Sequence, residues 1–174
     1  MTSLDPTVTD VSTYAGSWTL DPDRTSITFH TKAMWVLPVK GTFRALEGAG
    51  EVGADGSLSG TLVIDAASID TGNKKRDDHL RNADFLEVTA HPAITFTATG
   101  AVATPAGKVE VTGELTVHGR TKPLTLLAEV SATGDSATVS TEVEIDRSLW
   151  GLTWAQMGAG LKNRAVVTAH FHRP

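Results

Sequence analysis

The sequence of 174 residues contains no cysteine, which excludes disulfide bonds, thiolate zinc sites and cysteine nucleophiles. It also lacks any apolar run of the roughly 18 to 20 residues that a transmembrane helix needs. Basic residues are few: 15 Lys and Arg stand against 20 Asp and Glu, for a net charge of −5. This balance provides no overall basic field, so we expect no nucleic-acid partner and no stable membrane insertion.

The N-terminal region has no export signature, because no Lys or Arg precedes Arg24 and no apolar core follows the first residue. Residues 1–14 are rich in Ser, Thr, Asp and Val without periodicity. We therefore expect a disordered tail followed by one domain over residues 15–174, which is an ordinary domain size. The expected location is cytoplasmic.

Apolar and polar residues alternate along most of the chain, as in strands with one buried and one solvated face. In SITFHTKA, Ile27, Phe29 and Ala33 share one face, and Thr28 and Lys32 share the other. The same pattern covers residues 58–64, 94–102, 109–117, 124–130, 139–145 and 165–172. Short turn signals between these runs indicate antiparallel neighbours.

About eight such strands must close or stack, because an open sheet would leave an apolar face and two edges in water. A two-sheet sandwich satisfies this requirement, and so does an up-and-down barrel. The inward faces consist mainly of Ala, Val, Thr, Gly and Leu, and the chain has only five Phe. A barrel of this strand number with small inward residues has room for one small ligand. We therefore predict an all-β, antiparallel eight-stranded β-barrel with a cavity.

The stretch TGNKKRDDHLRNADFL, residues 71–86, is the most chemically crowded part of the chain. It predicts a short helix over about 74–82, with Asn73 as the N-cap and Asp77 in the first turn. Asp77 and Arg81 have the i, i+4 spacing of an ion pair on a helix surface. The structural interpretation is a helix that covers one end of the barrel.

The alternative is a metal-dependent barrel enzyme that uses Asp77, Asp78, His79 and His91, since carboxylates and imidazoles bind metal ions. Successive helix residues point about 100° apart, so the three sequential side chains cannot all face one ion. We therefore favour the structural interpretation and predict no catalytic residue, no metal ligand and no cofactor.

The remaining histidines also have two interpretations. His170 and His172 share one face of a strand, but two ligands alone bind a metal weakly, so we expect no ligand role for them. We interpret His118, in VHGRTK, as a solvated turn residue.

Two apolar segments stand where polar loops are usual. SLWGLTWAQMGAGL, residues 148–161, has no charge, and AMWVLPV, residues 33–39, has the same character. Either each segment folds onto the core, or together they form an apolar mouth that contains Met34, Trp35, Trp150 and Trp154. Such a mouth, together with edge strands, would also allow a homodimer.

From Trp18 to its end the chain resembles the YceI-like family. The resemblance rests on WTLDPDRTSITF, VKGTF, SIDTGNKKRDDHLRNADFLEVTAHPAITF, VTGELTVHGRTKPLTL and IDRSLWGL, in this order. It implies a lipocalin-like barrel that binds polyisoprenoids and related amphiphiles. Ala33 stands where the family commonly has a His, so any headgroup contact of that His is missing here.

We therefore predict non-catalytic binding, storage or transport of a long apolar molecule, a polyisoprenoid or isoprenoid quinone, with this amphiphilic lipid as the partner. The metal-dependent enzyme is one alternative, and a ligand-free interaction module that uses residues 148–161 is another. Alternation and the two apolar segments suggest the ligand-binding residues Phe29, Met34, Trp35, Phe43, Leu62, Ile64, Phe96, Leu115, Leu126, Trp150, Trp154 and Met157.

Overall fold

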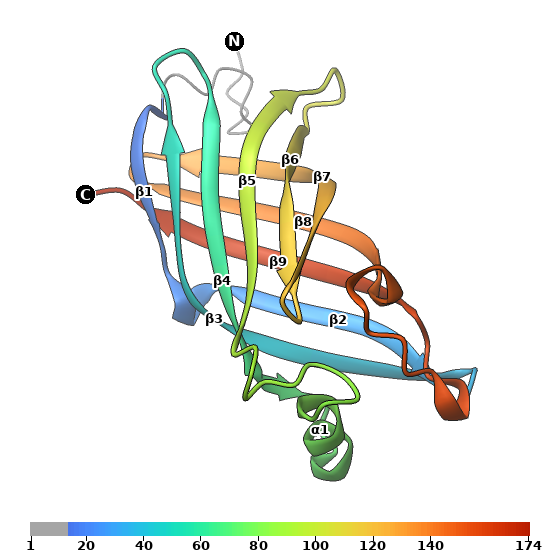
Figure 1. Ribbon diagram of the computed structural model, residues 1–174. Coiled ribbons are helices and arrows are strands. Elements are labelled where there is room, and N and C mark those ends of the chain that lie inside the picture. The colour runs from blue at the N-terminus through green and yellow to red at the C-terminus, as the bar shows by residue number, and fades with distance from the viewer. Residues whose placement is uncertain (1–13) are drawn as a thin grey trace.

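A computed structural model describes residues 14–174, so the predicted tail lies outside the described residues apart from Tyr14. The described chain forms one antiparallel sheet that closes on itself as a barrel (Figure 1). Its strands are β1 (Gly16–Leu20), β2 (Ser26–Ala33), β3 (Leu37–Val52), β4 (Leu58–Asp70), β5 (Ala93–Ala103), β6 (Val109–Val117), β7 (Arg120–Thr133), β8 (Ser136–Asp146) and β9 (Lys162–His172). No helix among these residues is long and apolar enough to cross a bilayer.

The barrel has eight strand positions, because β1 and β2 share one. Both strands pair antiparallel with β3 and with β9, β1 through Gly16 opposite Val52 and β2 through Ile27 opposite Phe43. The 3-10 helix η2 (Pro22–Arg24) separates them, and Pro22 has no N–H to give to a ladder. All other neighbours are consecutive in the chain, and β9 closes the barrel against β2. This confirms the predicted eight-stranded up-and-down barrel.

Strand β3 was not predicted by alternation. Its register against β4 shifts between Thr42 and Arg44 and again between Ala45 and Glu47, as at β-bulges. A bulge inserts an extra residue and so breaks the period of two on which the prediction depended. Residues 37–39, which we expected in an apolar loop, begin this strand, and only 34–36 form the turn before it.

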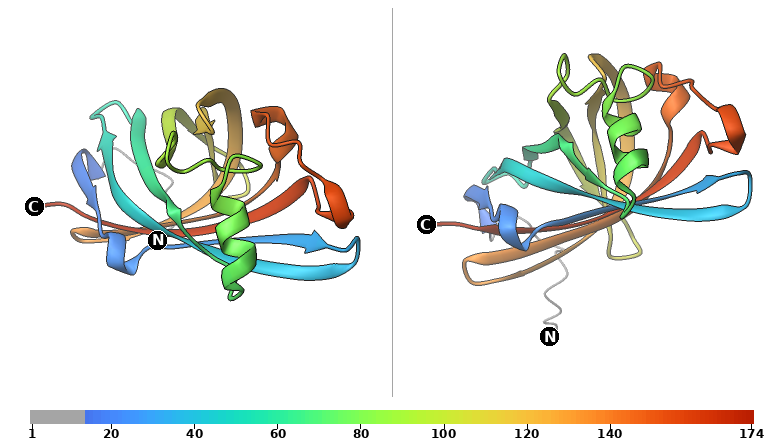
Figure 2. Two further views of the ribbon diagram at one scale, coloured as in Figure 1. Left: turned by 60° about the horizontal axis from the view of Figure 1, so that its bottom comes forward. Right: turned by 90° about the horizontal axis from the view of Figure 1, so that it is seen from below.

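The helix α1 (Lys74–Arg81) follows β4 and lies at one end of the barrel (Figures 1 and 2). As predicted, Asn73 caps it by accepting a hydrogen bond from the Arg76 amide at 3.0 Å. The helix ends one residue earlier than expected, at Arg81, and Asn82 is the C-cap.

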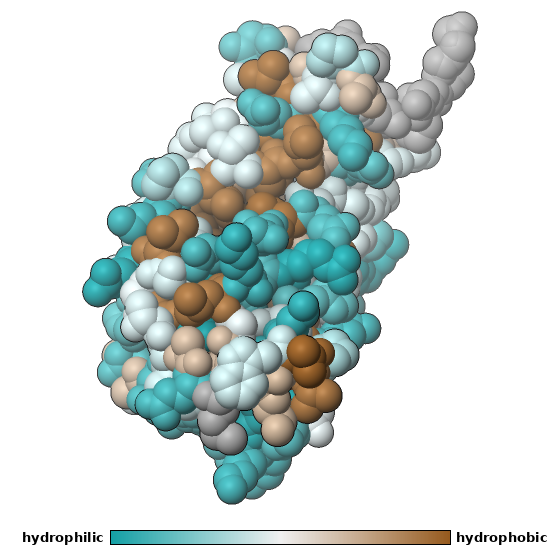
Figure 3. Space-filling view, turned by 90° about the vertical axis from the view of Figure 1, so that its right-hand side faces the viewer, coloured by the Kyte–Doolittle hydropathy of each residue, from teal (hydrophilic) through white to brown (hydrophobic). Residues whose placement is uncertain are grey.

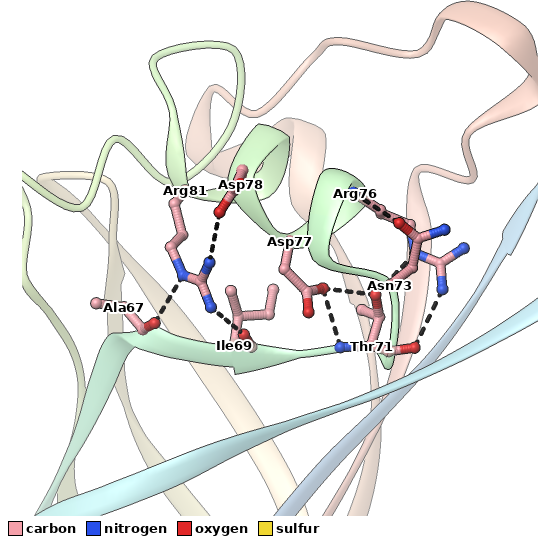
Figure 4. Close-up of polar contacts among 8 residues, drawn as sticks. All are labelled: Ala67, Ile69, Thr71, Asn73, Arg76, Asp77, Asp78 and Arg81. Atoms are coloured by element: carbon pink, nitrogen blue, oxygen red, sulfur yellow. Dashed lines mark hydrogen bonds and ion pairs between the residues drawn. The ribbon is translucent and has the colours of Figure 1, made fainter.

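The predicted Asp77–Arg81 ion pair is wrong (Figure 4). Arg81 instead contacts Asp78 at 3.1 Å and donates to the carbonyl oxygens of Ala67 and Ile69 on β4. Asp77 is buried and accepts hydrogen bonds from the Thr71 amide at 2.9 Å and from the Thr71 hydroxyl at 2.5 Å. Both side chains therefore fasten the helix to the end of β4 and do not stabilise the helix alone.

The connection from β8 to β9 contains two short 3-10 helices, η3 (Arg147–Trp150) and η4 (Gln156–Gly158). It lies beside the tip of the β2–β3 hairpin (Figures 1 and 2). The Trp35 amide donates to the Gly158 carbonyl at 3.1 Å, and the Gly160 amide donates to the Lys32 carbonyl at 2.8 Å. The two segments that we predicted as a mouth are therefore neighbours.

Candidate functional site

A cavity of about 910 Å³ lies inside the barrel and is lined by residues of all nine strands. Its volume is in the range of pockets that hold small molecules. Its walls are mostly apolar, as expected for the inward face of an alternating strand. The predicted cavity is therefore present.

Small residues in register make this interior wide. Gly50 on β3 pairs with Gly60 on β4, Gly60 pairs with Ala98 on β5, and Ala98 pairs with Gly113 on β6. The row thus crosses four neighbouring strands with at most one methyl group at each position. Gly50, Gly60 and Ala98 line the cavity, because side chains this small leave the space beside them free. At Gly113 the Phe96 ring occupies that space.

Ten of the twelve predicted ligand-binding residues line the cavity, namely Phe29, Met34, Phe43, Leu62, Ile64, Phe96, Leu115, Leu126, Trp150 and Trp154. Trp35 does not line it and is 74% exposed at the tip of the β2–β3 hairpin. The side chain of Met157 lies outside the described part of the chain. That any of the twelve contacts a ligand stays a prediction.

Aromatic residues line the cavity at the end where α1 lies. Trp150 is buried and its indole N–H donates to the Leu115 carbonyl at 2.8 Å. The ring of Trp154 lies 4.7 Å from the His79 ring and 5.1 Å from the Phe85 ring, between centroids. His79 and Phe85 also line the cavity, and alternation could not have found them because both lie outside the strands.

Arg147 holds the segment over this end, and sequence reasoning missed it. Its buried guanidinium donates to the carbonyl oxygens of Leu152 at 2.7 Å, Gly160 at 2.8 Å and Ala159 at 3.4 Å. Burial lowers the pKa of Arg147 from its usual value, and the neighbouring charge of Asp146 opposes this. One cation thus satisfies three carbonyl groups of an apolar segment that forms part of the cavity wall.

The charged lining residues are unevenly distributed. Lys32 lies just before the β2–β3 tip and Lys75 and Arg76 belong to α1. All three line the cavity, as does Arg147 of η3. Glu51, at the far end of β3, is the one carboxylate among the described lining residues. The cavity therefore combines a long apolar interior with positive charge at one end.

The side chains of the alternative, a metal-dependent enzyme, are not gathered at one site. Asp77 binds Thr71, Asp78 binds Arg81, and His79 contacts Asp84 at 2.9 Å. Their polar partners are those of a scaffold, which agrees with the structural interpretation of this stretch.

His91 instead lies beside Glu87 and His118. These three form the one group of at least three His, Asp or Glu side chains with converging ligand atoms within residues 14–174. The Glu87 carboxylate contacts His118 at 3.1 Å and lies 3.9 Å from His91. His118 lies in a turn, as predicted, but the expectation that it is solvated is wrong, because its side chain is half-buried and hydrogen-bonded to Glu87.

Comparison with known proteins gives a consistent result. The family model described as YceI-like domain matches residues 18–172. The protein YceI of Shigella flexneri is 45% identical over 74 residues, which cover 42% of this chain and 38% of the relative. A UPF0312 protein of Vibrio parahaemolyticus is 34% identical over 114 residues, covering 63% of this chain and 59% of the relative. The matches thus span about two fifths to three fifths of these relatives.

Solved structures share the fold. BcnA of Burkholderia cenocepacia superposes with a TM-score of 0.76 at 22% identity and covers 87% of this chain and 98% of its own. A polyisoprenoid-binding domain from Saccharophagus degradans superposes with a TM-score of 0.73 at 18% identity and covers 90% and 98%. These similarities identify the same barrel architecture in all three proteins.

Proposed function

The chain belongs to the YceI-like family, and on that basis we propose that it binds a long apolar chain, a polyisoprenoid or isoprenoid quinone, inside its barrel without catalysing a reaction. The observation that carries this proposal is the apolar cavity of about 910 Å³. The polyisoprenoid-binding domain from Saccharophagus degradans, which has the same fold, supports it.

The energetics favour a long ligand. Each buried methylene contributes about 0.8 kcal/mol, so a five-carbon prenyl unit contributes about 4 kcal/mol as an upper bound. Ordering a flexible chain offsets part of this gain. The cavity would therefore select by length and shape, with the polar headgroup at the end near α1, where Lys75 and Arg76 line it.

A cavity-filling substitution tests the proposal. Ala98→Trp places an indole in the row of small residues that keeps the interior wide. Thr97→Trp is the matched control, because Thr97 is the preceding residue of β5, is exposed and does not line the cavity. We expect titration with a prenyl lipid, followed by tryptophan fluorescence, to show at least about tenfold weaker binding for Ala98→Trp.

The control should bind like the wild type, and circular dichroism should show folded protein in all three cases. Equal affinity of the two variants would contradict binding in the barrel.

We also propose that the protein stores or transports its ligand, and that it acts in the cytoplasm. Fractionation of cells that express the complete gene product tests the location.

A further inference from the structure

The tip of the β2–β3 hairpin exposes four consecutive apolar residues. Met34 is 53% exposed, Trp35 74%, Val36 75% and Leu37 50%. Turns usually carry Gly, Pro, Asn, Asp or Ser, and an exposed apolar run of this length in a natural protein indicates a function. Met34 and Trp35 adopt positive φ values of 49° and 66°, which bulky residues rarely do. The turn thus keeps large apolar side chains where smaller polar residues would fit with less strain.

The neighbouring segment extends this surface. Gly160 is bonded to Lys32 through the backbone, and the next residue, Leu161, is 37% exposed. We name the side chains of residues 34–37 together with Leu161 the apolar tip. The space-filling view from this side shows apolar patches among hydrophilic residues (Figure 3).

Positive charge flanks the apolar tip, although the chain as a whole carries a net charge of −5. Residues 26–41 include Lys32 and Lys40, both exposed, and contain no Asp or Glu. No ion pair joins either lysine to a carboxylate of residues 14–174. The surface around the apolar tip is therefore cationic and apolar, although the net charge of the whole sequence is negative.

We propose that the apolar tip docks on a lipid bilayer that contains anionic headgroups. Trp and Lys are residues that settle at the boundary between hydrocarbon and headgroups, with apolar parts inward and polar parts in water. Lysines near the membrane surface are attracted to anionic headgroups. The same headgroups repel the acidic remainder of the molecule, so the tip is the part that faces the bilayer. A bilayer also accepts a projecting hairpin tip without the shape complementarity that a protein partner would need.

The location of the apolar tip suggests that docking brings the cavity next to the bilayer, so that a lipid can pass between them. This inference rests on the proposed function. Lys32, Ala33 and Met34 line the cavity, as do Gly160 and Trp154 on the facing segment. The cavity thus reaches the same end of the barrel as the apolar tip. A lipid chain could move between bilayer and barrel at this end with little exposure to water, which would avoid the cost of hydrating its apolar surface.

Co-sedimentation with vesicles that contain no isoprenoid tests the docking. We expect the protein to bind phosphatidylcholine vesicles that include phosphatidylglycerol, and to bind pure phosphatidylcholine vesicles more weakly. Trp35→Ser/Val36→Ser should weaken binding at least about tenfold, and Lys32→Gln/Lys40→Gln should remove the dependence on phosphatidylglycerol. Val102→Ser/Leu127→Ser is the matched control, since these residues are 67% and 50% exposed outside the tip, and it should bind like the wild type.

Absence of vesicle binding, or equal loss in the control, would overturn the inference. A dimer that disappears in Trp35→Ser/Val36→Ser, without vesicle binding, would assign the tip to a second copy and also overturn it. Because these vesicles carry no cargo and the prenyl-lipid titration contains no vesicles, the two proposals can fail separately.

Discussion

Among single residues, Asp77 has the clearest structural role, because its buried carboxylate joins α1 to the end of β4 through Thr71. Asp77→Ala leaves these donors without a partner, and an unsatisfied buried group costs about 1 to 3 kcal/mol. We expect the free energy of unfolding, from urea denaturation, to fall by that amount. Asp78→Ala, which removes only an exposed ion pair with Arg81, should change it by less than about 0.5 kcal/mol. Equal losses would contradict this assignment.

The same residues show what the sequence can specify at this scale. The Asn73 cap was predictable because it depends on residues three positions apart. The partners of Asp77 and Arg81 were not, because both side chains reach back to β4 across a turn whose geometry the helix pattern does not contain. Likewise, ten ligand-binding candidates were placed on the cavity wall by alternation and the apolar segments, but Arg147 was missed because its three carbonyl partners lie in an irregular segment.

At the scale of elements, the segment between β8 and β9 depends on Arg147. Arg147→Met should leave its three carbonyl partners without a donor. Residues 152–160 should then open more often. We expect faster amide hydrogen exchange at Ala159 and Gly160 and a loss of about 1 to 3 kcal/mol in the free energy of unfolding. Arg164→Met is the control, because Arg164 pairs only with exposed Glu142. Unchanged exchange in Arg147→Met would show that the segment is held by other contacts.

The 3-10 helix η3 should respond to pH. Its cap, Asp146, accepts hydrogen bonds from the Ser148 hydroxyl and amide, and these bonds hold the pKa of Asp146 below its ordinary value of 3.8. A lowered pKa in the folded state means that the stabilisation is present above pH 3.8 and is lost as the pH falls below it. The melting temperature of Asp146→Ala should therefore lie below that of the wild type at neutral pH, and the difference should shrink in acid. A difference that grows in acid would contradict the sign.

A strand could be predicted from the sequence where apolar and polar residues alternate along its whole length. Strands β2 and β4 to β9 were found because each keeps an apolar face over many residues. Strand β3 was missed because its bulges interrupt that period, and β1 because only five residues precede the break at Pro22.

At the scale of the whole molecule, barrel closure followed from the sequence because many half-apolar strands with short turns must cover their apolar face. The width of the interior did not follow from any single strand. Gly50, Gly60 and Ala98 contribute to it, and they come into register only when β3, β4 and β5 pair. Whether this space holds a lipid chain is the central claim.

Native mass spectrometry of freshly purified protein, followed by organic extraction and mass analysis, tests that claim most directly. We predict one lipid-like molecule per chain, or, for protein purified empty, uptake of one prenyl lipid per chain on incubation. Protein that retains no lipid and takes up none would contradict the account and favour a barrel that acts only through its surface.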